Sequence, residues 1–201
     1  HTGARLLILV AVEGEEIFGA IPVFCEERYR GFLRKVSSPP YPTAVPYLGP
    51  IFPYSDRLKQ SKWERRFFDF QRELDRYFKS EIKPHSIFIS TSTTMLDTRP
   101  FLWSGFNVLP RYTYKGNITD LNLSWHRLNQ SLRKWVIKAK EIGVTIEEGD
   151  VKDYNFIIES LRGRYKSENK QLDVSAEYLM DVYHQLYPSN LRVFVSRYKG
   201  E

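Results

Sequence analysis

The chain has 201 residues, 42% hydrophobic and 15% aromatic, which is enough apolar material for one large domain or two small ones. Its single cysteine, Cys25, excludes a disulfide-rich scaffold, and the four histidines show no metal-ligand spacing, so we expect a reducing, cytoplasmic location, no metal and no prosthetic group. Thirty basic and 24 acidic residues leave a net charge of +6, which favours an anionic partner but not duplex DNA.

The two ends of the sequence, and its apolar runs, bear on the class of protein. No apolar run approaches the ~20 residues needed to cross a bilayer, so we expect no membrane span. The chain starts at His1, without an initiator Met or a signal-peptide pattern. It stops at Arg197–Glu201, a pattern typical of a strand that enters a hairpin turn. We interpret the chain as a piece of a longer protein.

The first part of the chain favours a sheet. Apolar strands are predicted over Arg5–Val12 and Ile17–Cys25, joined by a short turn that contains Gly14. Because Pro22 cannot donate a backbone hydrogen bond, the second strand should be an edge or bulged at that point. A third strand is expected over Gly31–Val36. The following segment, 37–53, holds six of the eleven prolines and can be neither a helix nor a central strand.

Later elements alternate between helices and strands. Helices are predicted over Ser61–Ser80, Ser124–Ile142, Asp153–Arg164 and Ser175–Leu186. Strands are predicted over Ser86–Ser90, within Asn107–Ile118, over Val144–Glu147 and over Leu191–Ser196. This order indicates an α/β (α+β) fold.

The predicted helix 124–142 carries the strongest charge signal. Its five cations have no acid among them before Glu141: they are Arg127, Arg133, Lys134, Lys138 and Lys140. Its apolar residues fall on one stripe that is expected to face a core: Trp125, Leu128, Leu132, Trp135, Val136 and Ala139. Arg133 and Lys140 flank this stripe, whereas the other three cations oppose it. Flanking cations can line a cleft for an anion, but a solvated helix face is the alternative.

Other features give weaker signals. The tyrosines of the Pro-rich loop, Tyr47 among them, either pack over a sheet edge or form a rigid rim for a substrate. Cys25 lies in a sequence typical of a strand and is predicted to be a buried structural thiol. The phosphate-loop, dinucleotide-binding, zinc-protease and nucleophile-elbow motifs are all missing from the sequence.

Several phrases in fixed order resemble one family. They are Ile21-Pro22-Val23-Phe24, Ser38-Pro39-Pro40, Pro46-Tyr47-Leu48-Gly49-Pro50, Trp103-Ser104-Gly105-Phe106, Pro110-Arg111-Tyr112-Thr113-Tyr114 and the run from Arg133 to Val144. Their order resembles the Fem-like acyltransferases, which are built from two tandem GNAT domains. The most characteristic is the basic helix pattern R-x-x-[IV]-x-K-A-x-x-x-G-[VI], which Arg133 begins.

The resemblance implies a GNAT-like fold with mixed, largely antiparallel sheets flanked by helices. Residues 1–110 would be the later part of a first GNAT-like unit, and 111–201 the opening of a second. The Gly-rich turn that usually holds an acyl-CoA pyrophosphate in this family is not in this sequence, which leaves the cofactor-binding and catalytic residues unassigned and puts the activity of the isolated chain in doubt.

The activity implied is N-acyl transfer, with acyl-CoA or aminoacyl-tRNA as co-substrate. The acceptor would be a small-molecule or peptidoglycan-precursor amine, and tRNA a possible partner. Phosphate and acceptor contacts would come from six residues: Arg133, Lys140, Lys134, Tyr47, Arg111 and Tyr112. The alternative is a non-catalytic module that binds RNA or another polyanion through the basic helix 124–142.

Overall fold

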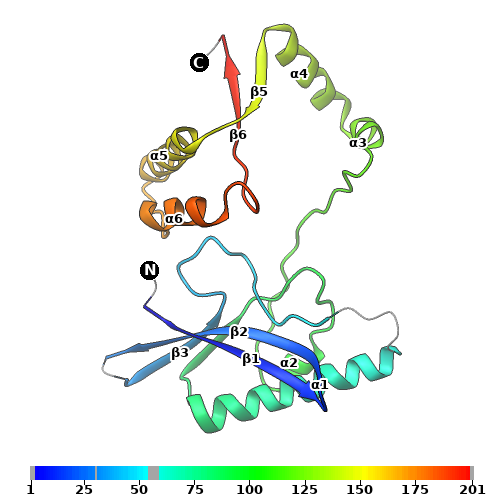
Figure 1. The fold of residues 1–201 in the computed structure, drawn as a ribbon, viewed down its shortest axis with the longest axis vertical. Helices are drawn as coiled ribbons and strands as arrows, with labels where there is room; N and C mark the ends of the chain where they lie inside the picture. The colour runs from blue at the N-terminus through cyan, green and yellow to red at the C-terminus, as the bar shows by residue number, and fades with distance from the viewer. Residues whose placement is uncertain (1–2, 30, 54–58, 200–201) are drawn as a thin grey trace. The chain divides into compact units, whose positions relative to one another are not determined.

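The computed structural model describes residues 3–29, 31–53 and 59–199, and divides the chain into two compact units, His1–Thr113 and Tyr114–Glu201 (Figure 1). Its described residues form six α-helices, one π-helical turn and two sheets, which is a mixed α+β architecture. None of the helices in these ranges is long and apolar enough to cross a bilayer. The division lies close to the expected boundary after residue 110; that each unit is part of a GNAT domain stays a prediction.

The first unit contains a four-stranded sheet, here called sheet A, in the order β1-β2-β3-β4. Strands β1 (Arg5–Glu13), β2 (Glu16–Arg28) and β3 (Leu33–Ser38) run antiparallel, and β4 (Ser86–Ile89) runs parallel to β3. The register of the hairpin shifts between Ala11 and Val12, so β2 carries a bulge. Pro22 lies in a stretch of β2 that has no described strand partner on one side. This stretch runs from Ala20, which forms a bridge to Ile51, to Phe24, where the pairing with β3 begins.

Helix α1 (Gln60–Tyr77) covers one face of sheet A, and the π-helical turn η1 (Phe78–Ile82) extends it. The helix presents an aromatic stripe because Phe67, Phe70 and Leu74 recur every three to four residues. These side chains are nearly inaccessible, and the core of the unit forms where Phe70 and Leu74 meet Ile21, Val23 and Val36 of the sheet. The short helix α2 (Arg99–Trp103) packs against α1, where the rings of Phe67 and Phe101 lie 5.7 Å apart.

The second unit contains a two-stranded antiparallel sheet, sheet B, made of β5 (Val144–Glu148) and β6 (Phe194–Tyr198). Helix α5 (Val151–Ser167) follows β5 and packs on α6 (Ala176–Leu186). In Figure 1 these two helices lie together near one end of sheet B, whereas α3 (Leu121–Arg127) and α4 (Gln130–Glu141) precede β5. The stacked rings of Tyr154 and Tyr183, 4.9 Å apart, join α5 to α6.

Two predictions about elements are wrong. The segment 107–118 forms no strand, because no described strand lies beside it to pair with. The helix predicted over 124–142 is two helices, because Leu128 has an extended backbone and Asn129 caps a new helix by accepting a hydrogen bond from the Ser131 N–H at 2.8 Å. The last strand also lies later than predicted, at Phe194–Tyr198.

Candidate functional site

The candidate site is the basic surface of α3 and α4, by which we mean the cations Arg127, Arg133, Lys134, Lys138 and Lys140. Side-chain caps fix where both helices begin: Asp120 accepts from the Leu123 N–H at 2.9 Å, and Asn129 starts α4. The segment 111–142 has seven Lys and Arg residues and two acidic ones, so it supplies +5 of the net charge of +6. Almost all the excess positive charge of the protein therefore lies in this one segment.

The cations of α4 have no carboxylate partner in the part of the chain that the structure describes. Arg133, Lys134 and Lys140 make no ion pair and no side-chain hydrogen bond with the described residues. Elsewhere arginines are saturated by carboxylates: Arg66 binds Glu13 and Glu16, Arg99 binds Asp97 and Glu64, and Arg197 binds Glu147 and Asp153. Uncompensated cations on one element create a local positive potential that attracts anions.

The apolar stripe of α4 is open, which differs from the expectation that it faces a core. Trp135 is 66% exposed and Leu132 54% exposed, because the main contact of α4 among the described elements is with β5, which follows its last turn. The prediction that Lys138 lies opposite this stripe is wrong. Its side chain lies beside the stripe, with Nζ 5.7 Å from the centre of the Trp135 ring. Of the two cations predicted to flank the stripe, Arg133 is half-buried and Lys140 is exposed.

The Pro-rich loop holds Tyr47 at the surface of the first unit. Hydrogen bonds anchor the loop on both sides, from Leu48 N–H to Ser90 O at 3.1 Å and in both directions between Ala20 and Ile51. Ser90 Oγ also donates to Pro46 O at 2.7 Å. Tyr47 is 43% exposed on this tethered loop, so its ring is available to a ligand. This geometry is compatible with a rigid aromatic rim.

Arg111 and Tyr112 lie at the end of the first unit, in the irregular segment that begins at residue 107. Tyr112 is 93% exposed and Arg111 is also exposed, without an ion pair to any described residue. The six predicted site residues are thus divided between two units, with Tyr47, Arg111 and Tyr112 in the first and Arg133, Lys134 and Lys140 in the second. Whether they form one site stays a prediction.

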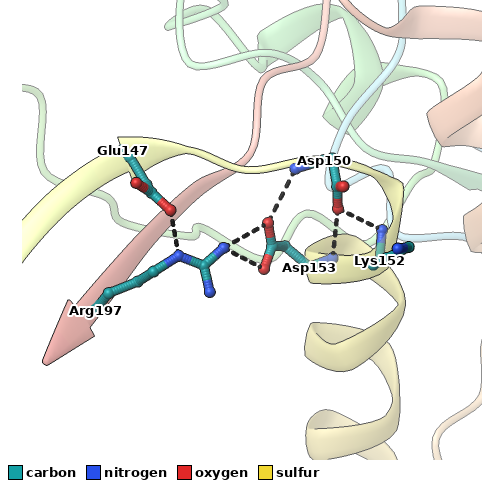
Figure 2. Close-up of polar contacts among 5 residues, drawn as sticks. All are labelled: Glu147, Asp150, Lys152, Asp153 and Arg197. Carbon is teal, nitrogen blue, oxygen red and sulfur yellow. Dashed lines mark hydrogen bonds and ion pairs between the residues drawn. The ribbon is translucent and has the colours of Figure 1, made fainter. Parts of the chain in front are cut away.

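Sequence reasoning missed a polar cluster in the second unit (Figure 2). The guanidinium of Arg197 on β6 donates to Glu147 on β5 and to both carboxylate oxygens of Asp153 in the first turn of α5. Asp150 caps α5 by accepting from the N–H groups of Asp153 and Lys152, which lowers the pKa of the Asp150 carboxyl. The spacing Asp150-x-x-Asp153 is the sequence signal for this cap.

The charged groups of this polar cluster form hydrogen bonds with one another. The hydrogen bonds to Glu147, and then those to Asp153, raise the pKa of Arg197, so the guanidinium stays charged and paired. Asp153 also accepts from the Asp150 N–H at 3.0 Å, which completes a reciprocal capping box. With each charged group already satisfied, the cluster fastens sheet B to α5 and leaves little capacity for a substrate.

Other chemistry-bearing residues do not assemble into a site. Among the described residues, no group of three or more His, Cys, Asp or Glu could hold a metal ion. Cys25 is buried, and burial raises the pKa of its thiol, so it remains protonated and is a poor nucleophile. A hollow between α5 and the start of α6 carries cations, but Arg162 and Lys170 there are paired with Glu159 and Glu168.

Comparison of the chain with protein-family models, with curated proteins and with solved structures gave no match. The basic surface of α4 is therefore judged by its own chemistry. It combines guanidinium and ammonium groups that form no ion pair with the described residues with an exposed indole beside one of them. Such a surface suits phosphate groups and, next to them, a flat ring.

Proposed function

We propose that the protein is a GNAT-fold N-acyltransferase of the Fem-like group, which transfers an acyl or aminoacyl group from acyl-CoA or aminoacyl-tRNA to an amine acceptor. The ordered phrases quoted above support the family. The observation that carries the proposal is the uncompensated charge of Arg133 and Lys140 on α4. Both donors carry phosphates, so both need cations that the protein does not itself neutralise.

In this mechanism the acceptor amine attacks the thioester or ester carbonyl directly, without an acyl-enzyme intermediate. The new C–N bond replaces the C–S or C–O bond to the donor, which leaves as the CoA thiol or the tRNA hydroxyl and takes up the proton that the amine loses. The chain's part is to hold the donor so that the carbonyl lies within reach of the amine. Arg133 suits a phosphate because its planar fork donates two parallel hydrogen bonds. Lys140 lies seven residues further on, about 10.5 Å along the helix axis, and would hold a second phosphate of the same donor. Tyr47, Arg111 and Tyr112 would contact the acceptor.

The Arg133→Ala variant tests this assignment. We expect the apparent affinity for the phosphate-bearing donor to fall about tenfold or more, because a charge-assisted hydrogen bond is lost. The melting temperature should hardly change, because Arg133 makes no ion pair with the described part of the chain. Arg164→Ala is the matched control: Arg164 is an exposed arginine on α5 whose Cζ lies 5.8 Å from the centre of the Tyr165 ring. If donor affinity is unchanged in Arg133→Ala, α4 does not bind the donor and its cations form only a solvated helix face.

The second candidate is a non-catalytic module that binds RNA through α3 and α4. The exposed ring of Trp135 favours it, because bases stack on open aromatic rings beside cations. Such a binder loses affinity steeply as salt rises and transfers no acyl group. Trp135→Ala should weaken RNA binding about tenfold or more. Acyl transfer from a thioester that contains no RNA would favour the enzyme over this candidate.

A further inference from the structure

Ser90 forms hydrogen bonds on both sides of Tyr47. It lies directly after β4, and its hydroxyl donates a hydrogen bond to the carbonyl oxygen of Pro46 at 2.7 Å. Its own carbonyl oxygen accepts a hydrogen bond from the Leu48 N–H at 3.1 Å. Pro46 and Leu48 are the immediate neighbours of Tyr47. One residue, 44 positions after Pro46, therefore holds the chain both before and after this tyrosine.

These two hydrogen bonds fix the backbone conformation of Tyr47. Peptide groups are planar, so the φ and ψ angles of a residue describe how its two flanking peptide groups are turned relative to each other. For Tyr47 these groups contain the Pro46 carbonyl and the Leu48 N–H, and Ser90 binds both of them. The direction in which the Tyr47 side chain leaves the backbone therefore depends on Ser90.

Prolines restrict the loop on either side of this point. A proline ring fixes its own φ and also restricts the residue before it, which limits residues 45–46 on one side and 49–50 on the other. Tyr47 and Leu48 lie between these pairs and have no such restriction. The hydrogen bonds of Ser90 therefore act where the covalent restriction by proline is missing.

Ser90 is itself held by sheet A. Its N–H donates to the carbonyl oxygen of Ser38 at 2.7 Å, which continues the pairing of β4 with β3. The loop also lies close against the sheet just after Tyr47, since a Cβ on Gly49 would be 2.7 Å from Cγ1 of the fully buried Ile21. Ser90 therefore connects the backbone of Tyr47 to the hydrogen-bonded sheet of the first unit.

We infer that Ser90 is a positioning residue for Tyr47, and that its hydroxyl holds the tyrosine ring in the orientation in which it contacts the amine acceptor. This inference rests on the proposed function, which assigns an acceptor contact to Tyr47. The Ser90 hydroxyl keeps its proton throughout and takes no part in the transfer step. It reduces the conformational freedom that Tyr47 would otherwise lose when the acceptor binds, which favours acceptor affinity.

Fluorine NMR of the full chain tests the inference without an activity assay. A 3-fluorotyrosine is incorporated in place of Tyr47, and its signal is recorded with and without further substitutions. Ser90→Ala should move the signal toward its position in the urea-unfolded chain, and Ser90→Thr, which keeps the hydroxyl, should restore it. Ser92→Ala is the matched control, because the Ser92 hydroxyl forms its 2.6 Å hydrogen bond within its own turn, with Thr94 Oγ1.

Hydrogen exchange of the Leu48 amide supplies the second measurement. Exchange should be about threefold or more faster in Ser90→Ala, because the loop opens more often once the bond to Pro46 is lost. The amides of β1 and β2 report on the stability of the whole first unit, and their exchange should change less. Equal acceleration in β1 and β2 would mean that Ser90 supports the unit as a whole, and overturns the inference.

Three further outcomes would contradict the positioning role. An unchanged fluorine signal or an unchanged Leu48 exchange rate in Ser90→Ala overturns it, and so does an equal change in Ser92→Ala. A signal in Ser90→Thr that coincides with that of Ser90→Ala overturns the role of the hydroxyl. None of these results depends on the donor affinity of Arg133→Ala, so the inference and the proposed function can fail separately.

Discussion

Arg197 donates two hydrogen bonds from its Nη2 to the carboxylate oxygens of Asp153, at 2.9 and 3.1 Å, across 44 residues of sequence (Figure 2). Arg197 lies on β6 and Asp153 in the first turn of α5. The pair therefore joins the two-stranded sheet B to the helix that follows β5. A two-stranded sheet is marginally stable alone, so this anchor matters to the whole second unit.

The Arg197→Met variant should lower the melting temperature of the second unit by about 5 °C, because two carboxylates lose their shared cation. Thermal unfolding followed by circular dichroism measures this change. Arg192→Met is the control, since Arg192 is more exposed and reaches Glu148 only at 4.0 Å. Equal effects of the two substitutions would contradict a specific role of the Arg197 anchor.

Asp150 should make the second unit sensitive to acid. Its folded pKa is lowered, first by the N–H of Asp153 and then by that of Lys152. In the unfolded chain the carboxyl takes up a proton near pH 3.9. The unfolded state therefore binds more protons, and the contribution of Asp150 to stability is complete above that pH and is lost as pH falls through the lowered folded pKa.

Asp150→Asn tests this pH dependence, because Asn also caps helices but does not titrate. The variant should show a shallower loss of melting temperature between about pH 5 and pH 2 than the unmodified chain. Asp181→Asn, on α6, is a comparison for the removal of one carboxylate that caps no helix. If Asp150→Asn and the unmodified chain lose stability in parallel below pH 5, the cap does not titrate as described.

Gly49 should not tolerate a side chain. A Cβ at this position would lie 2.7 Å from Cγ1 of Ile21 and 3.1 Å from Oγ of Ser38, both fully buried. Gly49→Ala should therefore destabilise the first unit by about 1–3 kcal/mol, as measured by urea unfolding. Gly116→Ala is the matched control, because nothing lies within 4 Å of its added Cβ, and it should change stability by less than about 0.5 kcal/mol.

Gln71 is a buried amide that the fold does not satisfy. It is 1% exposed, and neither its side-chain nitrogen nor its oxygen has a hydrogen-bond partner among the described residues. Gln71→Leu keeps a similar volume and removes two unpaired polar atoms, so it should raise the free energy of unfolding by about 1 kcal/mol. Gln71→Glu should do the opposite, because it adds a buried charge. A loss of stability in Gln71→Leu would mean that the amide has a partner or a role.

Hydrophobic periodicity predicted most elements of the fold. The hairpin of β1 and β2, helix α1 and the order of elements in the second unit follow from residues within one element, such as the aromatic stripe of Phe67, Phe70 and Leu74. The break at Leu128 and Asn129 was missed because the apolar stripe continues across it. The strand expected within 107–118 does not form, because β-prone residues form a strand only where another strand pairs with them.

For the candidate site, too, the sequence determined some features and the tertiary structure decided others. The sequence by itself determined that five cations lie on one segment without acids between them, since charge and spacing along a helix are local properties. Only the tertiary structure decided that Arg133, Lys134 and Lys140 have no carboxylate partner among the described residues whereas Arg66, Arg99 and Arg197 have two each, because ion pairs join residues from distant parts of the chain. The tertiary structure also decided the strand order β1-β2-β3-β4 of sheet A, since the position of a strand in a sheet depends on which strands pair with it.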